Sequence, residues 1–334
     1  MKKTYYLFNP GRLSRKDNTL CFTPVDERGN DQAPRYLPIE TVESLYCFGS
    51  LDTNSAMFNF LGKNHVSVHF FDYYEHYTGS FMSRDYLLAG KMQVEQTRSY
   101  LSRTKRLEIA RKIVQGAALN ILKVLTYYEN RGKALAGYTD KIRNLIASIG
   151  DTDKVEALMG IEGNIRQLYY ASFDVILNDF LLVNRTKRPP QNEVNAMISF
   201  GNTLCYTACL DQIYHTQLNP TISFLHQPGA RRYSLALDLS EIFKPILVDR
   251  TIFSLLNKKV IDESDFRHEL NSCLLKESAR KKFVQAFEER LNDSIKHRTL
   301  GRNVSFKHLI KLECYKLQKH ILGIEEYKPF RMLW

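Results

Sequence analysis

Two carboxylates and an imidazole lie close together in the chain between residues 226 and 241. Asp238 and Glu241 are three positions apart in a segment whose pattern predicts a helix, so they share one helix face. Like charges at this spacing repel each other unless a cation compensates them, and either a bound metal ion or a nearby base such as Lys244 could do so. His226 follows the apolar run TISFL and precedes a Pro-Gly turn, from which it could reach the same site.

Two or three carboxylate oxygens and one imidazole suit a hard to borderline divalent ion, Mg²⁺ or Mn²⁺. Such an ion can polarise a phosphodiester and activate a water or a hydroxyl group. From spacing alone, the alternative is a structural histidine beside a solvated acidic helix face. Both interpretations stay open at this level.

Glu162 is a further candidate, in the segment LMGIEGNIRQLYY at the edge of an apolar helical stripe. Its alternative role is an ion pair with Arg166 four residues on, which contributes only a few tenths of a kcal/mol. Gly160 and Gly163 flank it, and each lowers helix stability by about 1 kcal/mol relative to alanine. Two such glycines favour a place where another group approaches the backbone closely.

Basic and aromatic residues surround these candidates and could hold phosphates or stack on bases. Taken singly, each has an ordinary surface or core role as its alternative. Arg231 and Arg232 could also compensate the acidic pair. The set consists of Arg166, Tyr169, Tyr170, Lys187, Arg188, Arg231, Arg232, Lys244 and Arg250.

The charge of the chain favours an anionic partner. Its 47 Lys and Arg against 36 Asp and Glu give a net charge of +11. Residues 276–334 hold fourteen basic and seven acidic residues, so this region supplies +7 of that excess. Nucleic acid is the first expectation, an anionic membrane the second, and a merely Lys-rich surface the alternative.

Patterning predicts an α+β chain with two parts: a small β-sheet domain over 1–90 and a larger all-α domain over 91–334. Short β-branched and aromatic runs alternate with turn-forming clusters up to about residue 90, with a short helix at SAMFNFLGKN. Three- and four-residue apolar periods then predict helices from about residue 95 to 128, and over 155–183, 192–216, 234–259, 264–293 and 305–322. Ser234 is expected as an N-cap and Pro245 as a kink or break.

The six cysteines form no CxxC pair, which is typical of a reducing compartment. Cys205 and Cys209 are expected in a helix core. The sequence has no signal-peptide pattern and no apolar run of about 18 residues, so we expect a cytoplasmic chain without a membrane span.

Several segments together resemble the CRISPR-associated protein One family. They are GIEGNIRQLYY, PPQNEVNAMISFGNTLCY, NPTISFLHQPGARRYSLALDLSEIFKP and the closing YKPF, and the N-terminal strands are similar as well. The resemblance implies a β domain that serves dimerisation and DNA contact, followed by a helical catalytic domain. It implies a homodimer, a small CRISPR-associated protein Two dimer as partner, and double-stranded DNA as substrate.

The activity that the resemblance implies is that of a metal-dependent DNA endonuclease and integrase, which inserts short duplexes into a CRISPR array by transesterification. It assigns the metal ligands to Glu162, His226 and Glu241, with Asp238 as a second acid near the site. The third ligand is an aspartate in some members, so the choice between Asp238 and Glu241 stays open. Arg166, Tyr170, Lys244 and Arg250 remain candidate DNA contacts. The rival hypotheses are a nuclease on branched DNA in repair and a non-catalytic basic DNA-binding scaffold.

Overall fold

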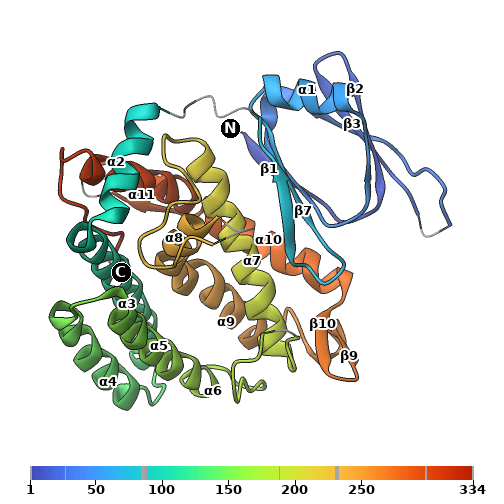
Figure 1. Ribbon diagram of the computed structural model, residues 1–334. Coiled ribbons are helices and arrows are strands. Elements are labelled where there is room, and N and C mark those ends of the chain that lie inside the picture. Colours follow the sequence, from blue (N-terminus) through green and yellow to red (C-terminus); the bar gives the residue numbers. More distant parts are fainter. Residues whose placement is uncertain are drawn as a thin grey trace. The chain divides into compact units, whose positions relative to one another are not determined.

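The chain divides into two compact units, Met1–Leu87 and Leu88–Trp334 (Figure 1). The computed structural model describes residues 2–26, 28–83, 87, 89–187, 189–229, 233–297 and 299–332. Strands are the main secondary structure of the first unit, and helices dominate the second, which confirms the α+β fold class expected from the sequence.

In the described residues, the first unit contains two four-stranded sheets. One has the order β1-β5-β7-β8, with parallel pairing up to β7 and antiparallel pairing of β8. The other has the order β4-β3-β2-β6, an antiparallel meander with β6 parallel to β2. The strands are β1 Lys3–Leu7, β2 Gly11–Lys16, β3 Thr19–Pro24, β4 Arg35–Pro38, β5 Val42–Cys47, β6 Leu51–Asp52, β7 Ser67–Phe71 and β8 Tyr77–Phe81.

Helix α1 (Ser55–Lys63) completes this unit at the place where the sequence predicts a short helix. Asn54 caps it, because the Asn54 side chain accepts a hydrogen bond from the backbone N–H of Met57 at 3.0 Å. Phe60 and Leu61 on its buried face join Leu45 and Val68 from the strands in one apolar core. Burial of that core drives the association of helix and sheets.

The second unit is mostly helical. Its helices are α2 Gly90–Leu101, α3 Arg103–Glu129, α4 Ala136–Ala147, α5 Val155–Ala171, α6 Phe173–Ile176, α7 Glu193–Tyr214, α8 Ser234–Lys244, α9 Arg250–Asn257, α10 Glu277–Asn292 and α11 Phe306–Ile321. Among the helices of the described ranges, none is both long and apolar enough to cross a bilayer.

Helix α7 forms the centre of this unit. It contacts α8, α9 and α11, and most of its residues are buried, on every side of the helix. Cys205 and Cys209 are among these buried residues, as expected. Helix α3 is the long amphipathic helix that the apolar period predicts, and it packs against α4, α5 and α8. These contacts place α5 and α8 beside the same long helix (Figure 1).

The expectation of an all-α second domain is corrected by two short hairpins. Residues 264–293 are not one helix, since β9 (Phe266–Glu269) and β10 (Ser272–Leu275) pair antiparallel before α10 begins. A second hairpin pairs β11 (Ser294–Lys296) with β12 (Asn303–Ser305). The few apolar residues of these short strands also fit a helical period by chance. Over only four residues, the two-residue spacing of a strand cannot be distinguished from the spacing of a helix.

Other expected boundaries also shift. The helix predicted over 155–183 ends at Ala171, and after the short α6 the described residues 177–187 and 189–192 contain no helix. Ser234 is the first residue of α8 and not its cap, since Tyr233 occupies the cap position; the Ser234 hydroxyl donates to the carbonyl oxygen of Thr221 at 2.9 Å. Pro245 does not end the helix. It opens a wide π-helical turn, Pro245–Asp249, that leads directly into α9.

Candidate active site

Helix α5 supplies a carboxylate and a guanidinium on the same face. Arg166 lies one turn after Glu162, and its Nε atom is 3.5 Å from Glu162 Oε1. The same guanidinium contacts Glu241 Oε2 on α8. It also lies 5.8 Å from the centre of the Tyr170 ring. The i,i+4 pair expected from the sequence is therefore present, and Arg166 additionally links α5 to α8.

Glu241 lies between two cations. Besides its contact with Arg166, its Oε1 atom accepts a hydrogen bond from Lys244 Nζ at 2.6 Å. Burial opposes ionisation of this carboxyl, but the charges of Lys244 and Arg166 outweigh burial and lower the pKa of Glu241 to about 2. Glu241 is thus an anion at neutral pH, and basic side chains compensate it.

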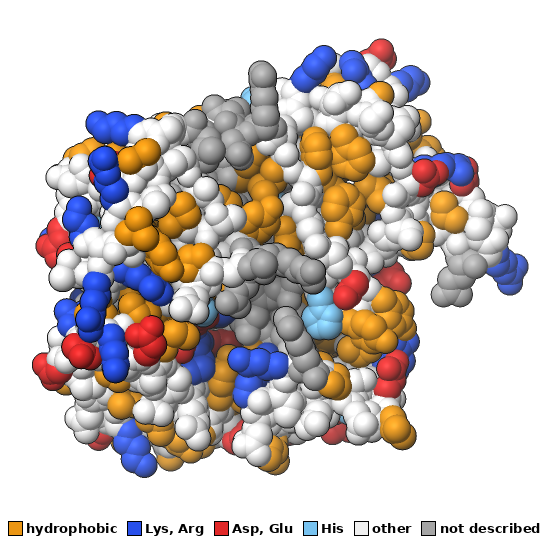
Figure 2. All heavy atoms as spheres, in the orientation of Figure 1, with side chains coloured by type: hydrophobic (Ala, Val, Ile, Leu, Met, Phe, Trp, Pro, Cys, Tyr) orange, Lys and Arg blue, Asp and Glu red, His pale blue; other side chains and the backbone are white. Residues whose placement is uncertain are grey.

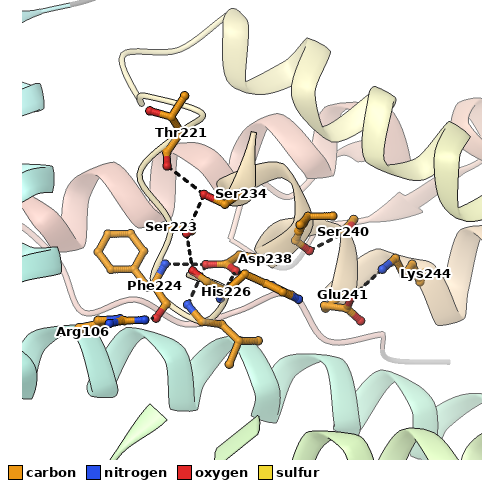
Figure 3. A network of polar contacts seen from close by, with 12 residues as sticks. Arg106, Thr221, Ser223, Phe224, His226, Ser234, Asp238, Ser240, Glu241 and Lys244 are labelled. Atoms are coloured by element: carbon orange, nitrogen blue, oxygen red, sulfur yellow. Dashed lines mark hydrogen bonds and ion pairs between the residues drawn. The ribbon is translucent and has the colours of Figure 1, made fainter. Parts of the chain in front are cut away.

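Asp238 has a different environment, although it is only three residues from Glu241. Its Oδ2 atom accepts hydrogen bonds from the backbone N–H groups of Phe224 and Leu225, at 2.7 and 2.9 Å. Its Oδ1 atom accepts from the backbone N–H of His226 at 2.9 Å and from His226 Nδ1 at 2.9 Å (Figure 3). Asp238 is fully buried, so these four bonds fix the loop before α8 to the helix.

The loop 221–226 is held from other sides as well. Ser223 donates to the carbonyl oxygen of His226 at 2.6 Å, and Arg106 of α3 donates to the carbonyl oxygen of Phe224 at 3.0 Å. The imidazole of His226 is therefore oriented by its Nδ1 bond, and Nε2 is the ring nitrogen that Asp238 does not engage (Figure 3).

Burial lowers the pKa of His226, but the hydrogen bond and charge of Asp238, with a further effect of Glu241, raise it overall above its ordinary value. A carboxylate at Nδ1 makes the opposite nitrogen a better electron donor.

A cavity of about 630 Å³ brings most of the candidates together. It receives side chains from α5, from the loops around residues 182–187 and 226, and from α7 and α8. Its lining residues are Met159, Glu162, Gly163, Arg166, Gln167, Tyr170, Ala171, Leu182, Val183, Asn184, Arg185, Lys187, Asn202, His226, Glu241 and Lys244. At Gly160 and Gly163, a Cβ atom would meet no other atom within 4 Å, so the helix surface is open there.

Other candidates lie elsewhere. Asp238 is not among the lining residues, since its carboxylate is engaged behind His226. Arg250 also is not, and its guanidinium lies 4.3 Å from the centre of the Tyr127 ring. Tyr169 is fully buried. Arg188, Arg231 and Arg232 fall outside the described residues. Lysine and arginine side chains occur at many points on the visible surface of the helical unit, mixed with acidic ones (Figure 2).

The three predicted metal ligands share the cavity without forming a tight cluster. Within the described part of the helical unit, a tight group of possible metal ligands is formed by Glu193, His268 and Cys273, whose ligand atoms all lie within 4.8 Å of one another. Glu162, His226 and Glu241 do not meet that distance. Both oxygens of Glu241 are instead engaged by Lys244 and Arg166.

The structure adds residues to the site that sequence reasoning did not select. Arg185 lines the cavity, and its Nη1 and Nη2 atoms donate to Asn195 Oδ1 and Ser199 Oγ on α7, at 2.9 and 3.0 Å. Behind the cavity, Asp249 is buried in the π-helical turn, and burial raises its pKa to about 7 despite the opposing charge of Arg166. The basic run RTKRPP signalled Arg185 by charge alone, and nothing in the sequence signalled Asp249.

The chain thus combines a sheet-rich unit with a helical unit, and the cavity of the helical unit contains an imidazole, two carboxylates and several cations. Such a cavity suits an enzyme that acts on an anionic polymer. The family model described as CRISPR associated protein Cas1 matches residues 5–289, and the chain belongs to this family, as its motifs indicated. A CRISPR-associated endonuclease Cas1 2 of Thermodesulfovibrio yellowstonii is 46% identical over 100% of both chains.

Solved structures agree with this assignment. A Cas1 protein from Thermotoga maritima, TM1797, is 35% identical and superposes with a TM-score of 0.85, covering 98% of this chain and 100% of that one. A casposase bound to integration product superposes with a TM-score of 0.86 at 21% identity, covering 98% of this chain and 93% of that one. At that identity the second likeness concerns the fold alone.

Proposed function

We propose that the chain is a divalent-metal-dependent DNA endonuclease and integrase, which inserts short duplex DNA into a CRISPR array by transesterification. The observation that carries the proposal is the cavity in which Glu162, His226 and Glu241 lie together with the cations Arg166 and Lys244. Membership in a family whose relative is named an endonuclease supports DNA cleavage and joining as the reaction class.

The donor set fits Mg²⁺ or Mn²⁺, since it offers carboxylate oxygens and one imidazole nitrogen. We assign Glu162, His226 and Glu241 as the ligands. Asp238 is the residue that orients His226, because its own oxygens already accept four hydrogen bonds away from the cavity. When bound, such an ion would polarise the phosphodiester and neutralise charge on the attacking and leaving oxygens.

Each oxygen of Glu241 accepts one hydrogen bond, from Lys244 or from Arg166, and retains a second lone pair with which it could bind a metal ion. Without a metal ion, the charges of Glu162 and Glu241 are balanced by those of Arg166 and Lys244. A bound divalent ion would give this cluster a net positive charge, and the cluster would then attract a phosphodiester, with Arg166 and Lys244 available to pair with a phosphate oxygen.

The rim of the cavity can position the DNA. Arg185 and Lys187 lie on the loop that lines one side, and Tyr170 lies on the same helix as Glu162. Cations hold backbone phosphates and an aromatic ring stacks on an unpaired base. This arrangement would place the 3′-hydroxyl of an incoming strand next to the phosphodiester that it attacks, which lowers the barrier by proximity.

The resemblance supports the partners. We propose that the chain acts as a homodimer in the cytoplasm, that it binds a dimer of the small CRISPR-associated protein Two, and that it holds double-stranded DNA from both the incoming spacer and the repeat.

The experiment that tests the proposal is joining of a short duplex to a supercoiled plasmid carrying the array, with Mn²⁺ or with chelator, and with or without the small partner. Glu162→Gln and His226→Ala should abolish joining while light scattering still shows the dimer. Glu156→Gln is the matched control, because Glu156 is an exposed acid in the first turn of the same helix.

Full joining by Glu162→Gln would remove that residue from the site. Metal-dependent cleavage of branched DNA without any joining would favour a repair nuclease. DNA binding without cleavage, unchanged by His226→Ala, would leave only a scaffold.

A further inference from the structure

A second group of ligand-type side chains lies in the helical unit, apart from the cavity described above. Glu193, His268 and Cys273 each offer one ligand atom, and these atoms all lie within 4.8 Å of one another. None of the three lines the candidate active site. They come from the start of α7 and from both strands of the β9–β10 hairpin (Figure 1).

The hairpin places His268 and Cys273 side by side. They are direct cross-strand partners, one position before and after the pair that closes the two-residue turn. The backbone N–H of Cys273 donates to the carbonyl oxygen of Pro190 at 2.8 Å and not across the hairpin. The two residues therefore form a non-hydrogen-bonded pair, the type in which side chains on the same face approach most closely.

Helix α7 brings the third side chain. Its cap residue Asn192 accepts a hydrogen bond from the backbone N–H of Asn195 at 2.9 Å, which makes Glu193 the first residue of the helix. Glu193 Oε1 lies 3.0 Å from His268 Nε2. The bond from Cys273 to Pro190 and the cap at Asn192 thus fix the hairpin and the helix start relative to each other.

The donor atoms are a sulfur, an imidazole nitrogen and a carboxylate oxygen. Zn²⁺ binds these three at about 2.3, 2.0–2.1 and 2.0–2.2 Å, so tetrahedral ligands around it lie about 3.5 Å apart. That separation is compatible with the observed cluster. We propose that Glu193, His268 and Cys273 form a site for Zn²⁺ or a similar borderline divalent ion, with a solvent molecule in the fourth position.

Exposure of the cluster permits entry of an ion. The side chain of Cys273 is buried, whereas that of His268 is 58% exposed and that of Glu193 is 20% exposed. Burial raises the pKa of the Cys273 thiol to about 12, and Glu193 adds to this effect. When the ion binds, the thiol releases its proton to solvent and the sulfur lone pair bonds to the metal.

The site would stabilise the frame of the candidate active site. Asn192 and Asn195, on either side of Glu193, hold the segment 181–186, since they bond to Leu182, Asn184 and Thr186. Part of that segment lines the cavity. A metal ion that ties the hairpin to the start of α7 would therefore make this support more rigid, in a structural rather than a catalytic role.

Cobalt substitution tests the proposal on the whole purified protein. Co²⁺ bound to a thiolate gives a sulfur-to-metal charge-transfer band in the near ultraviolet, and the ligands proposed for the active site contain no sulfur. We expect this band at about one equivalent of Co²⁺, its bleaching by Zn²⁺, and its loss in Cys273→Ser. Glu162→Gln should retain it, so that the outcome is independent of the proposed catalytic function.

Cys21→Ser is the matched control, because Cys21 is a partly exposed thiol in the sheet-rich unit and its substitution should leave the band unchanged. Circular dichroism checks that Cys273→Ser is folded. If it is not, His268→Ala, at an exposed position, should still shift or weaken the band. Absence of the band in the wild type, or a band unaffected by Cys273→Ser or His268→Ala in folded protein, would overturn the proposal.

Discussion

Replacement of Asp238 by asparagine tests whether one buried carboxylate both holds the 224–226 loop and orients His226. Asparagine has nearly the same shape, but one of its two terminal atoms is an amide nitrogen that cannot accept a hydrogen bond. If its oxygen continues to serve His226, its nitrogen faces the donor N–H groups of Phe224 and Leu225. The variant therefore loses two bonds to a charged acceptor and gains a contact between donors.

The magnitude follows from these bonds. Hydrogen bonds to a charged group contribute about 1.5–3 kcal/mol each, so the loss of two lowers the free energy of unfolding by about 3–6 kcal/mol. That is a large fraction of a total of about 5–15 kcal/mol. Loss of the carboxylate at Nδ1 should also slow DNA joining by about 10- to 100-fold, the usual effect of removing a partner of a metal-bound histidine.

Urea unfolding measures the first effect, and the joining rate at a temperature where the variant is folded measures the second. Asp140→Asn serves as control, because Asp140 is an exposed residue whose ion pair is with Arg143 on the same helix. Its unfolding free energy should change by less than about 0.5 kcal/mol. If Asp238→Asn stayed within the same limit and joined DNA at the wild-type rate, the role given to this carboxylate would be wrong.

Two further predictions concern the core behind the site. Burial raises the folded-state pKa of Asp249 from 3.8 to about 7, so ionisation of this carboxyl lowers the free energy of unfolding as the pH rises from about 4 to 7. Over that interval, Asp249→Asn should therefore lose less stability than the wild type in urea titrations at several pH values. Parallel curves for the two proteins would contradict this prediction. At Gly201 on α7, a Cβ atom would lie 2.5 Å from Val248 Cγ1 and 2.8 Å from Phe283 Cζ, and both of these side chains are buried. Gly201→Ala should therefore lower the free energy of unfolding by about 1–3 kcal/mol. An unchanged denaturation midpoint would show that the helices separate freely at this position.

Periodicity was sufficient where an element is long and has one apolar face. The helix beginning at Arg103 and the buried helix Glu193–Tyr214 lie where their patterns predict them. The β9–β10 hairpin was missed because its strands have only four residues each, and α10 follows immediately. Periodicity is judged over about 11–18 residues, so the pattern of the adjacent helix dominates over that of a four-residue strand.

The candidate site could be assembled from the sequence only as a set of residue types. Lys244 was a foreseeable partner of Glu241, since it lies three residues on along the same helix. The bond between Arg166 and Glu241 joins residues 75 positions apart and depends on how α5 and α8 pack. The difference between Asp238 and Glu241 likewise depends on a loop that folds back over α8, which spacing along one helix does not encode.

The π-helical turn at Pro245–Asp249 sets the rotational phase between α8 and α9. An ordinary helix advances about 100° per residue, and a π turn contains one residue more than an α turn. Because both kinds of turn complete about one rotation, removal of one residue here would let the helix run straight and would leave Phe253 and Leu256 close to their present orientation toward the core. A single deletion at Pro245–Asp249 should therefore be better tolerated than one inside α8 or α9, where it would rotate every later side chain by about 100°.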